Sequence, residues 1–116
     1  MTQHASLTPD RWRAFARDQQ LMMIANEMNR ASRLLGPNDV SAFRRCYERV
    51  LRLVDLTVEV NAARALRREL LRWREQAAEI FLAPDPTVGQ HRLLFRALLQ
   101  LTPATARQIP FVLGRG

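Results

Sequence analysis

Apolar residues recur at spacings of three and four along most of the chain, which is typical of amphipathic helices. One such stripe comprises Val40, Phe43, Tyr47, Val50, Val54 and Val58, and a second comprises Leu66, Leu70, Trp73, Ala77 and Ile80. Charged residues occupy the opposite side of each stripe. No segment alternates apolar and polar residues as a strand would. The pattern therefore predicts an all-α fold.

Capping residues and prolines divide this helical pattern into segments. Helix starts are signalled by Thr8-Pro9-Asp10, by Asp85 or Thr87 and by Thr102-Pro103, and helix ends by Gly36-Pro37 and Pro110. We expect one helical domain over residues 1–116, with a loose arm at 1–7, helices at about 9–35, 39–59, 62–82, 87–101 and 103–109, and an apolar tail at 110–116. Because the connections are short, the expected fold is a four-helix, mostly antiparallel bundle with a short fifth helix.

Residues 39–82 are compatible with one helix or with two. At about 100° per residue, the apolar faces of 40–58 and 66–80 point roughly 150° apart, so one straight helix would present its halves to opposite sides. The join is rich in β-branched residues and contains Asn61, a candidate cap for a new helix. These features favour a break near 59–62. The alternative is a single helix of about 44 residues, or about 66 Å, which would need a partner chain to cover one half.

The first predicted helix is apolar on every side over residues 21–25, which are five consecutive hydrophobic residues. A helix that is apolar all round must be covered all round, either by the other helices of the bundle or by a second chain. The second interpretation predicts a subunit interface. The apolar tail would dock onto its own bundle or onto a neighbouring chain. We therefore include its residues in the predicted interface. The residues predicted for the interface are Leu21, Met22, Met23, Ile24, Met28, Phe111 and Leu113.

Charge adds a candidate anion-binding surface. The chain has a net charge of +7, and its 18 basic residues are all arginine. Arginine is preferred for phosphate and carboxylate, but a total lack of lysine fits a GC-rich genome better. Trp73 falls on the apolar side, so no aromatic stacking platform accompanies the arginines. The face is therefore a solvated helix side or a surface for a polyanion, and its members are Arg64, Arg67, Arg68, Arg72 and Arg74.

Catalytic and metal-binding motifs are absent from the sequence. It has no Glu-x-x-His, His-x-x-x-His or Cys-x-x-Cys pair and no glycine-rich phosphate loop. His91 and Cys46 fall on apolar helix faces, where we expect a satisfied buried histidine and a structural thiol. We therefore expect no enzyme, no cofactor and no metal. One cysteine, no signal-like N-terminus and no long apolar run lead us to expect a cytoplasmic protein without a membrane segment.

These observations favour a non-catalytic protein-interaction or assembly module that forms a homodimer through its first helix. The alternative is a basic regulatory protein that binds nucleic acid or another polyanion through the arginine face. A weaker alternative is an accessory subunit whose arginines contact an acidic protein surface.

Overall fold

The structure is a computed structural model that describes residues 7–35 and 39–114. Residues 1–6 of the arm predicted at 1–7, the Gly36-Pro37 stop and residues 115–116 lie outside the described residues, whereas Leu7 packs against the core. Within the described part, the chain forms only helices and connections. The helices are α1 (Pro9–Arg13), α2 (Arg17–Leu35), α3 (Val40–Val60), α4 (Arg64–Leu82), α5 (Val88–Leu99), α6 (Pro103–Ala106) and α7 (Ile109–Val112). The predicted all-α class is confirmed.

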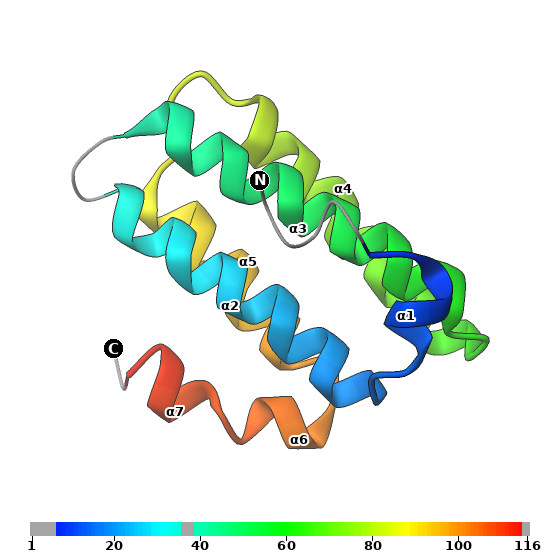
Figure 1. Cartoon of the computed structure of the whole chain (residues 1–116). Coiled ribbons are helices and arrows are strands. Elements are labelled where there is room, and N and C mark those ends of the chain that lie inside the picture. The colour runs from blue at the N-terminus through cyan, green and yellow to red at the C-terminus, as the bar shows by residue number, and fades with distance from the viewer. Residues whose placement is uncertain (1–6, 36–38, 115–116) are drawn as a thin grey trace.

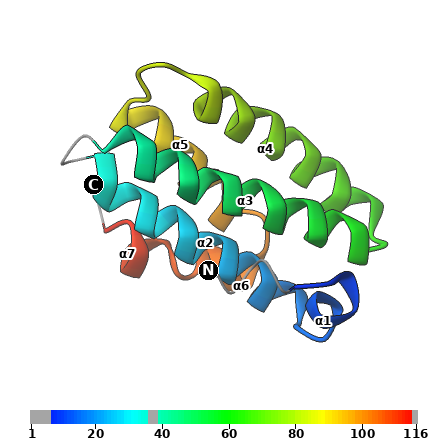
Figure 2. The ribbon, with the colours of Figure 1, turned by 45° about the horizontal axis from the view of Figure 1, so that its top comes forward.

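The long helices α2 to α5 form a four-helix bundle (Figure 1). Helix α2 packs against α3 and α5, and α4 packs against the same two helices from the other side. Helices α2 and α4 therefore lie on one diagonal of the bundle, with α4 at its outer edge in Figure 2. The short α6 and α7 run along the side of the bundle that carries α2 (Figures 1 and 2).

The first long helix is not continuous over 9–35, and this prediction is wrong. The chain breaks at residues 14–16, between α1 and α2. In a straight helix, Trp12 would point about 180° away from Leu21, out of the core. The break swings α1 across α3, where Trp12 is fully buried and its indole N–H donates to Thr57 Oγ1 at 2.9 Å. The side chain of Gln20 fixes the bend by donating to the carbonyls of Trp12 and Phe15.

A second break separates α3 from α4 at residues 61–63, so the segment 39–82 is two helices. Asn61 does not cap α4, contrary to our expectation. Its side-chain amide donates to the carbonyl of Thr57 and to Gln20 Oε1, at 2.8 and 2.9 Å. Asn61 thus completes the end of α3 and joins it to the start of α2. The N-cap position of α4 is Ala63, whose side chain accepts no capping hydrogen bond.

The C-terminal region differs from the predicted helix at 103–109 and simple tail. Helix α6 ends at Ala106, and residues 109–112 form the separate helix α7. Pro110 does not end a helix but lies in the first turn of α7, where its missing N–H costs nothing. Ile109, Val112 and Leu113 pack against the core, and Arg92 of α5 donates to the carbonyl of Leu113. The tail therefore docks onto its own bundle.

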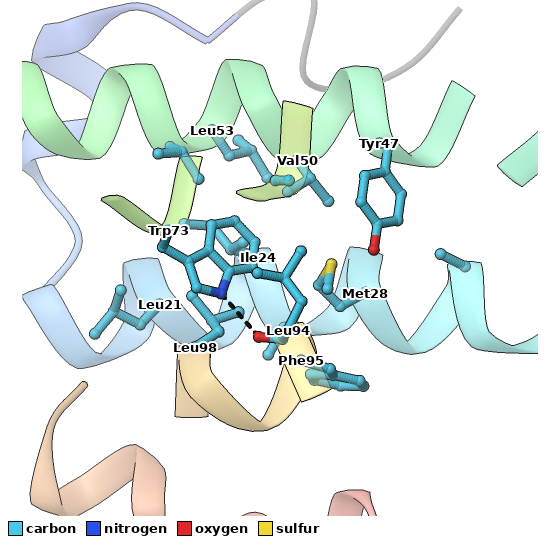
Figure 3. Packing of buried hydrophobic residues seen from close by; sticks show 14 of the residues in the cluster. Leu21, Ile24, Met28, Tyr47, Val50, Leu53, Trp73, Leu94, Phe95 and Leu98 are labelled. Carbon is cyan, nitrogen blue, oxygen red and sulfur yellow. Dashed lines mark hydrogen bonds between the residues drawn. The ribbon is translucent and has the colours of Figure 1, made fainter. Parts of the chain in front are cut away.

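The core lies between α2, α3, α4 and α5, which all contribute side chains to it (Figure 3). Trp73 enters from α4 and its indole N–H donates to the carbonyl of Leu94 at 2.8 Å. Leu21, Ile24 and Met28 of α2 have no exposed surface. Met22 and Met23 are partly buried and pack against the core.

The predicted subunit interface on the first helix is therefore wrong for Leu21, Ile24 and Met28. Their side chains are covered by this chain alone. The physical reason is the position of α2, which has α3 and α5 on two sides and contacts α6 on another. A helix that is apolar all round is satisfied here without a partner.

The Trp12–Thr57 hydrogen bond should contribute measurably to stability. Thr57→Val keeps the side-chain shape but leaves the buried indole N–H without an acceptor, so we expect about 1–3 kcal/mol of destabilisation in urea unfolding. Trp12→Phe serves as the second arm of a double-mutant cycle. If the two substitutions destabilise additively, the hydrogen bond does not hold α1 in place.

Candidate functional site

A buried polar network surrounds His91, whose side chain is only 2% exposed. Its Nδ1 lies 2.7 Å from Tyr47 Oη on α3. Its Nε2 lies 2.8 Å from Ser32 Oγ and 3.1 Å from the carbonyl oxygen of Met28, both on α2. The ring itself comes from α5. The network therefore joins α2, α3 and α5, and it has the outline of a serine–histidine pair with tyrosine as the third group.

Only one arrangement of protons satisfies this network. Tyr47 has no other hydrogen-bond acceptor among the described residues, so its hydroxyl must donate to His91 Nδ1. The proton of the ring then sits on Nε2, which donates toward Ser32 Oγ and the Met28 carbonyl. Ser32 in turn donates to the Met28 carbonyl at 3.1 Å. His91 therefore has no lone pair facing Ser32, and it cannot act as a base for that hydroxyl.

Electrostatics support the same interpretation. Burial lowers the pKa of His91 to about 4, against a smaller opposing effect of the hydrogen bond to the Met28 backbone. The imidazole is thus neutral at pH 7. Burial also raises the pKa of Tyr47, so its hydroxyl remains a donor. The expectation of a satisfied buried histidine holds. Sequence reasoning missed Ser32 and Tyr47 as its partners, because they lie 59 and 44 positions away along the chain.

A second buried polar cluster centres on Glu27 of α2, which is 3% exposed. Its carboxylate pairs with Arg49 Nε of α3 at 3.0 Å and with Arg30 at 3.2 Å. Arg49 also donates to Cys46 Sγ at 3.3 Å. Burial outweighs these cations and raises the pKa of the Cys46 thiol. The Glu27–Arg49 pair therefore holds α2 against α3, whereas the thiol accepts from Arg49 within α3.

Residues 7–35 and 39–114 contain no group of three His, Cys, Asp or Glu side chains that could hold a metal ion. None of the helices in the same ranges combines the length and the apolar character needed to cross a bilayer.

The five arginines predicted as an anion-binding face do not act together. Arg74 points toward α3, where its Nε and Nη2 donate to the Asp55 carboxylate at 2.6 and 3.2 Å, and this hydrogen bonding raises the pKa of Arg74. Arg72 lies 3.5 Å from Glu69. The other three, Arg64, Arg67 and Arg68, are exposed and make no ion pair with the described residues.

Large apolar side chains are exposed on α4 and α5, away from the predicted interface on the first helix. The exposed fractions are 49% for Leu71, 74% for Leu82, 61% for Val88 and 73% for Leu93. A groove of about 340 Å³ runs between the two helices, and we call it the α4–α5 groove. It is lined by Gln76, Glu79, Ile80, Ala83, Gln90, Leu93 and Leu94.

The tail residues of the predicted interface take different positions. Phe111 is 83% exposed, whereas Leu113 is partly buried against the core. Only Phe111 of that pair presents a side chain to solvent. Sequence reasoning missed Leu82 and Leu93, whose only signal was that each lies outside the apolar stripe of its helix.

The comparisons with known proteins give no family. No family model, no curated protein and no solved structure matches this chain.

The neutral state of His91 predicts a pH-dependent stability. The folded pKa of about 4 lies below the ordinary value of 6.5, so only the unfolded state takes up this proton between those two values. The contribution of His91 to the free energy of unfolding should thus be at its maximum above pH 6.5. It should fall by about 3 kcal/mol as the pH drops to 4. Urea unfolding of the wild type and His91→Gln at pH 7, 5.5 and 4.5 measures this. An equal pH slope in both proteins would contradict the assignment.

The proton arrangement also predicts that Ser32 is not a nucleophile. A fluorophosphonate probe, which labels base-activated serines, should leave Ser32 unmodified because its hydroxyl donates to the Met28 carbonyl. Mass spectrometry of the intact protein after incubation gives the result, with Ser32→Ala as the control. Labelling that Ser32→Ala abolishes would show that the network is catalytic.

Proposed function

We propose that the protein is a non-catalytic protein-interaction module whose contact surface lies on the outer sides of α4 and α5. The observation that carries this proposal is the α4–α5 groove with Leu93 exposed at its edge, on two helices that also expose Leu71, Leu82 and Val88. Exposed apolar residues scattered singly are common, but several on neighbouring helices together with a groove are typical of a binding surface.

The groove has the chemistry of a helix-binding or peptide-binding surface. Ile80 and Leu94 lie at its floor with 8% and 3% exposure, and Leu93 stands at its edge with 73% exposure. Gln76, Glu79 and Gln90 supply polar groups along the same groove. An apolar centre with a polar rim suits an amphipathic segment of a partner, whose apolar side chains would take the place of water over Leu93.

The buried polar groups support a role without catalysis. His91, Ser32 and Tyr47 use their protons to bond one another and the backbone. Glu27 is paired with arginine on either side. Groups held in this way stabilise the bundle, and none of these four side chains is free to act as a base or nucleophile. We include a cytoplasmic location in the proposal, because a single buried thiol requires no oxidising compartment.

Polyanion binding is the second candidate. It is favoured by Arg64, Arg67 and Arg68, which are exposed and lack ion pairs within the described chain. It is opposed by Glu75 and Glu79, which are exposed on the same helix and would repel phosphate. Three arginines with two nearby carboxylates give a weaker field than the five cations expected from the sequence. An acidic protein surface fits these arginines equally well.

Site-specific photo-cross-linking in the cells that naturally make this protein tests the proposal. p-Benzoylphenylalanine at position 93 should yield one discrete protein adduct, because Leu93 stands at the edge of the groove. The matched control is position 100, where Gln100 is exposed at the end of the same helix. Identical adduct patterns at both positions would overturn the proposal. A nuclease-sensitive adduct at position 71 alone would favour polyanion binding instead.

A further inference from the structure

The outer face of α4 carries its charges in two separate blocks. We define the α4 outer face as Arg64, Arg68, Leu71, Glu75, Glu79 and Leu82, which all fall within about 80° on the side opposite the buried stripe. All six are exposed. The two arginines stand at the start of the helix, the two glutamates toward its end, and Leu71 lies between the blocks. None of the four charged residues makes an ion pair with the described part of the chain.

This arrangement works against the helix that carries it. Arg64 and Arg68 are four residues apart, as are Glu75 and Glu79, so each pair places like charges side by side. The order of the blocks also opposes the helix dipole, which favours acidic residues at the start and basic residues at the end. The first turn of α4 contains no acidic residue and its last turn no basic one. The stability of an isolated bundle therefore does not explain the pattern.

The same pattern is complementary to itself in the reverse direction. Positions 64 and 79 lie at equal distances on either side of the point between residues 71 and 72, and so do positions 68 and 75. Two α4 helices laid antiparallel about that point would bring Arg64 opposite the partner's Glu79 and Arg68 opposite the partner's Glu75. A twofold axis repeats both pairs, so four ion pairs would flank a central contact of Leu71 with the partner's Leu71.

We propose that a second copy of this chain binds along the α4 outer face in an antiparallel twofold arrangement. This inference rests on the proposed function and names one partner for the outer side of α4. The face is open for such a contact because α4 packs mainly against α3 and α5 and lies diagonally opposite α2. Between positions 64 and 79 it spans about 22 Å. The antiparallel arrangement also places the positive end of each helix dipole beside the negative end of the other.

Such a dimer is weak and salt-dependent. One helix face buries less surface than the roughly 1,000 Å² expected for a stable complex. Exposed ion pairs contribute little each, and salt screens them over about 10 Å at 0.1 M. We therefore expect association at tens to hundreds of micromolar protein in low salt. Raising the salt to 0.5 M should weaken that association several-fold, since the contact is mostly ionic.

Charge reversal tests the proposed pairing. In Arg64→Glu/Arg68→Glu the face becomes wholly acidic, and in Glu75→Arg/Glu79→Arg it becomes wholly basic. Sedimentation equilibrium at low salt should show each variant monomeric alone, with association weakened at least tenfold. An equimolar mixture of the two should form a heterodimer. Both variants keep a net positive charge, since each changes the net charge of +7 by four units. Long-range attraction therefore cannot account for the mixing result.

The matched control is Arg33→Glu/Arg107→Glu, which makes the same change in net charge at exposed positions outside α4. It should associate as the wild type does, and it should not pair with Glu75→Arg/Glu79→Arg beyond the wild-type level. Circular dichroism establishes that each variant is folded. A wild type that stays monomeric at 0.5 mM protein in low salt would overturn the inference, and so would a mixture that does not associate.

Disulfide trapping tests the register. Leu71→Cys lies beside the twofold axis and should form a symmetric disulfide quickly under mild oxidation. Leu82→Cys should react slowly, although Leu82 is the more exposed residue at 74% against 49%. Faster reaction at position 82 would overturn the antiparallel register. A monomeric protein with a discrete adduct at position 93 would refute only the self-association, whereas a monomer with no specific adduct would refute the proposed function as well.

Discussion

The apolar surface of α2 is the constraint on which the rest of the structure depends. Residues 21–25 present hydrophobic side chains in every direction, and water cannot be left against all of them. The chain meets this constraint internally, with α3 and α5 on two sides of α2 and α6 on a third. Helix α4 completes the bundle from the opposite diagonal. As a result α2 has little apolar surface left for a partner, and most of the exposed large apolar side chains lie on α4 and α5.

Polar groups inside the bundle hold that arrangement in one register. A buried polar side chain costs free energy unless it is hydrogen-bonded or paired. In this bundle three such side chains each find a partner on a helix other than their own. Trp12 joins α1 to α3, His91 joins α5 to α2 and α3, and Glu27 joins α2 to α3. Alternative packings of similar apolar faces would leave these groups unpaired. The side chains that resemble catalytic groups are therefore better understood as the connections that select one packing.

Periodicity predicted the fold class and the buried sides of α3 and α4, because those depend on spacing within one helix. It failed where a contact distant in sequence decides the local structure. The helix breaks at 14–16 because Trp12 is buried against α3, where it donates a hydrogen bond to Thr57. No residue near position 14 indicates this break in the sequence. The partners of His91 and the Arg74–Asp55 pair likewise join separate helices. The interface on α2 was misjudged for a related reason, since an all-round apolar helix shows only that it is covered and not by what.

The outer side of α4 shows what an amphipathic pattern conceals. The buried apolar stripe alone is enough to identify α4 as an amphipathic helix. Its remaining positions are then easily taken for an ordinary solvated face. Among them, however, Leu71 and Leu82 are apolar, and the four charges of the α4 outer face are sorted by sign along the helix axis. A larger apolar patch in this place would favour unspecific aggregation, whereas two leucines among ordered charges favour contact in only one orientation. Specificity on this surface therefore comes from the order of the charges, and the leucines supply contact only after the charges have aligned the partner.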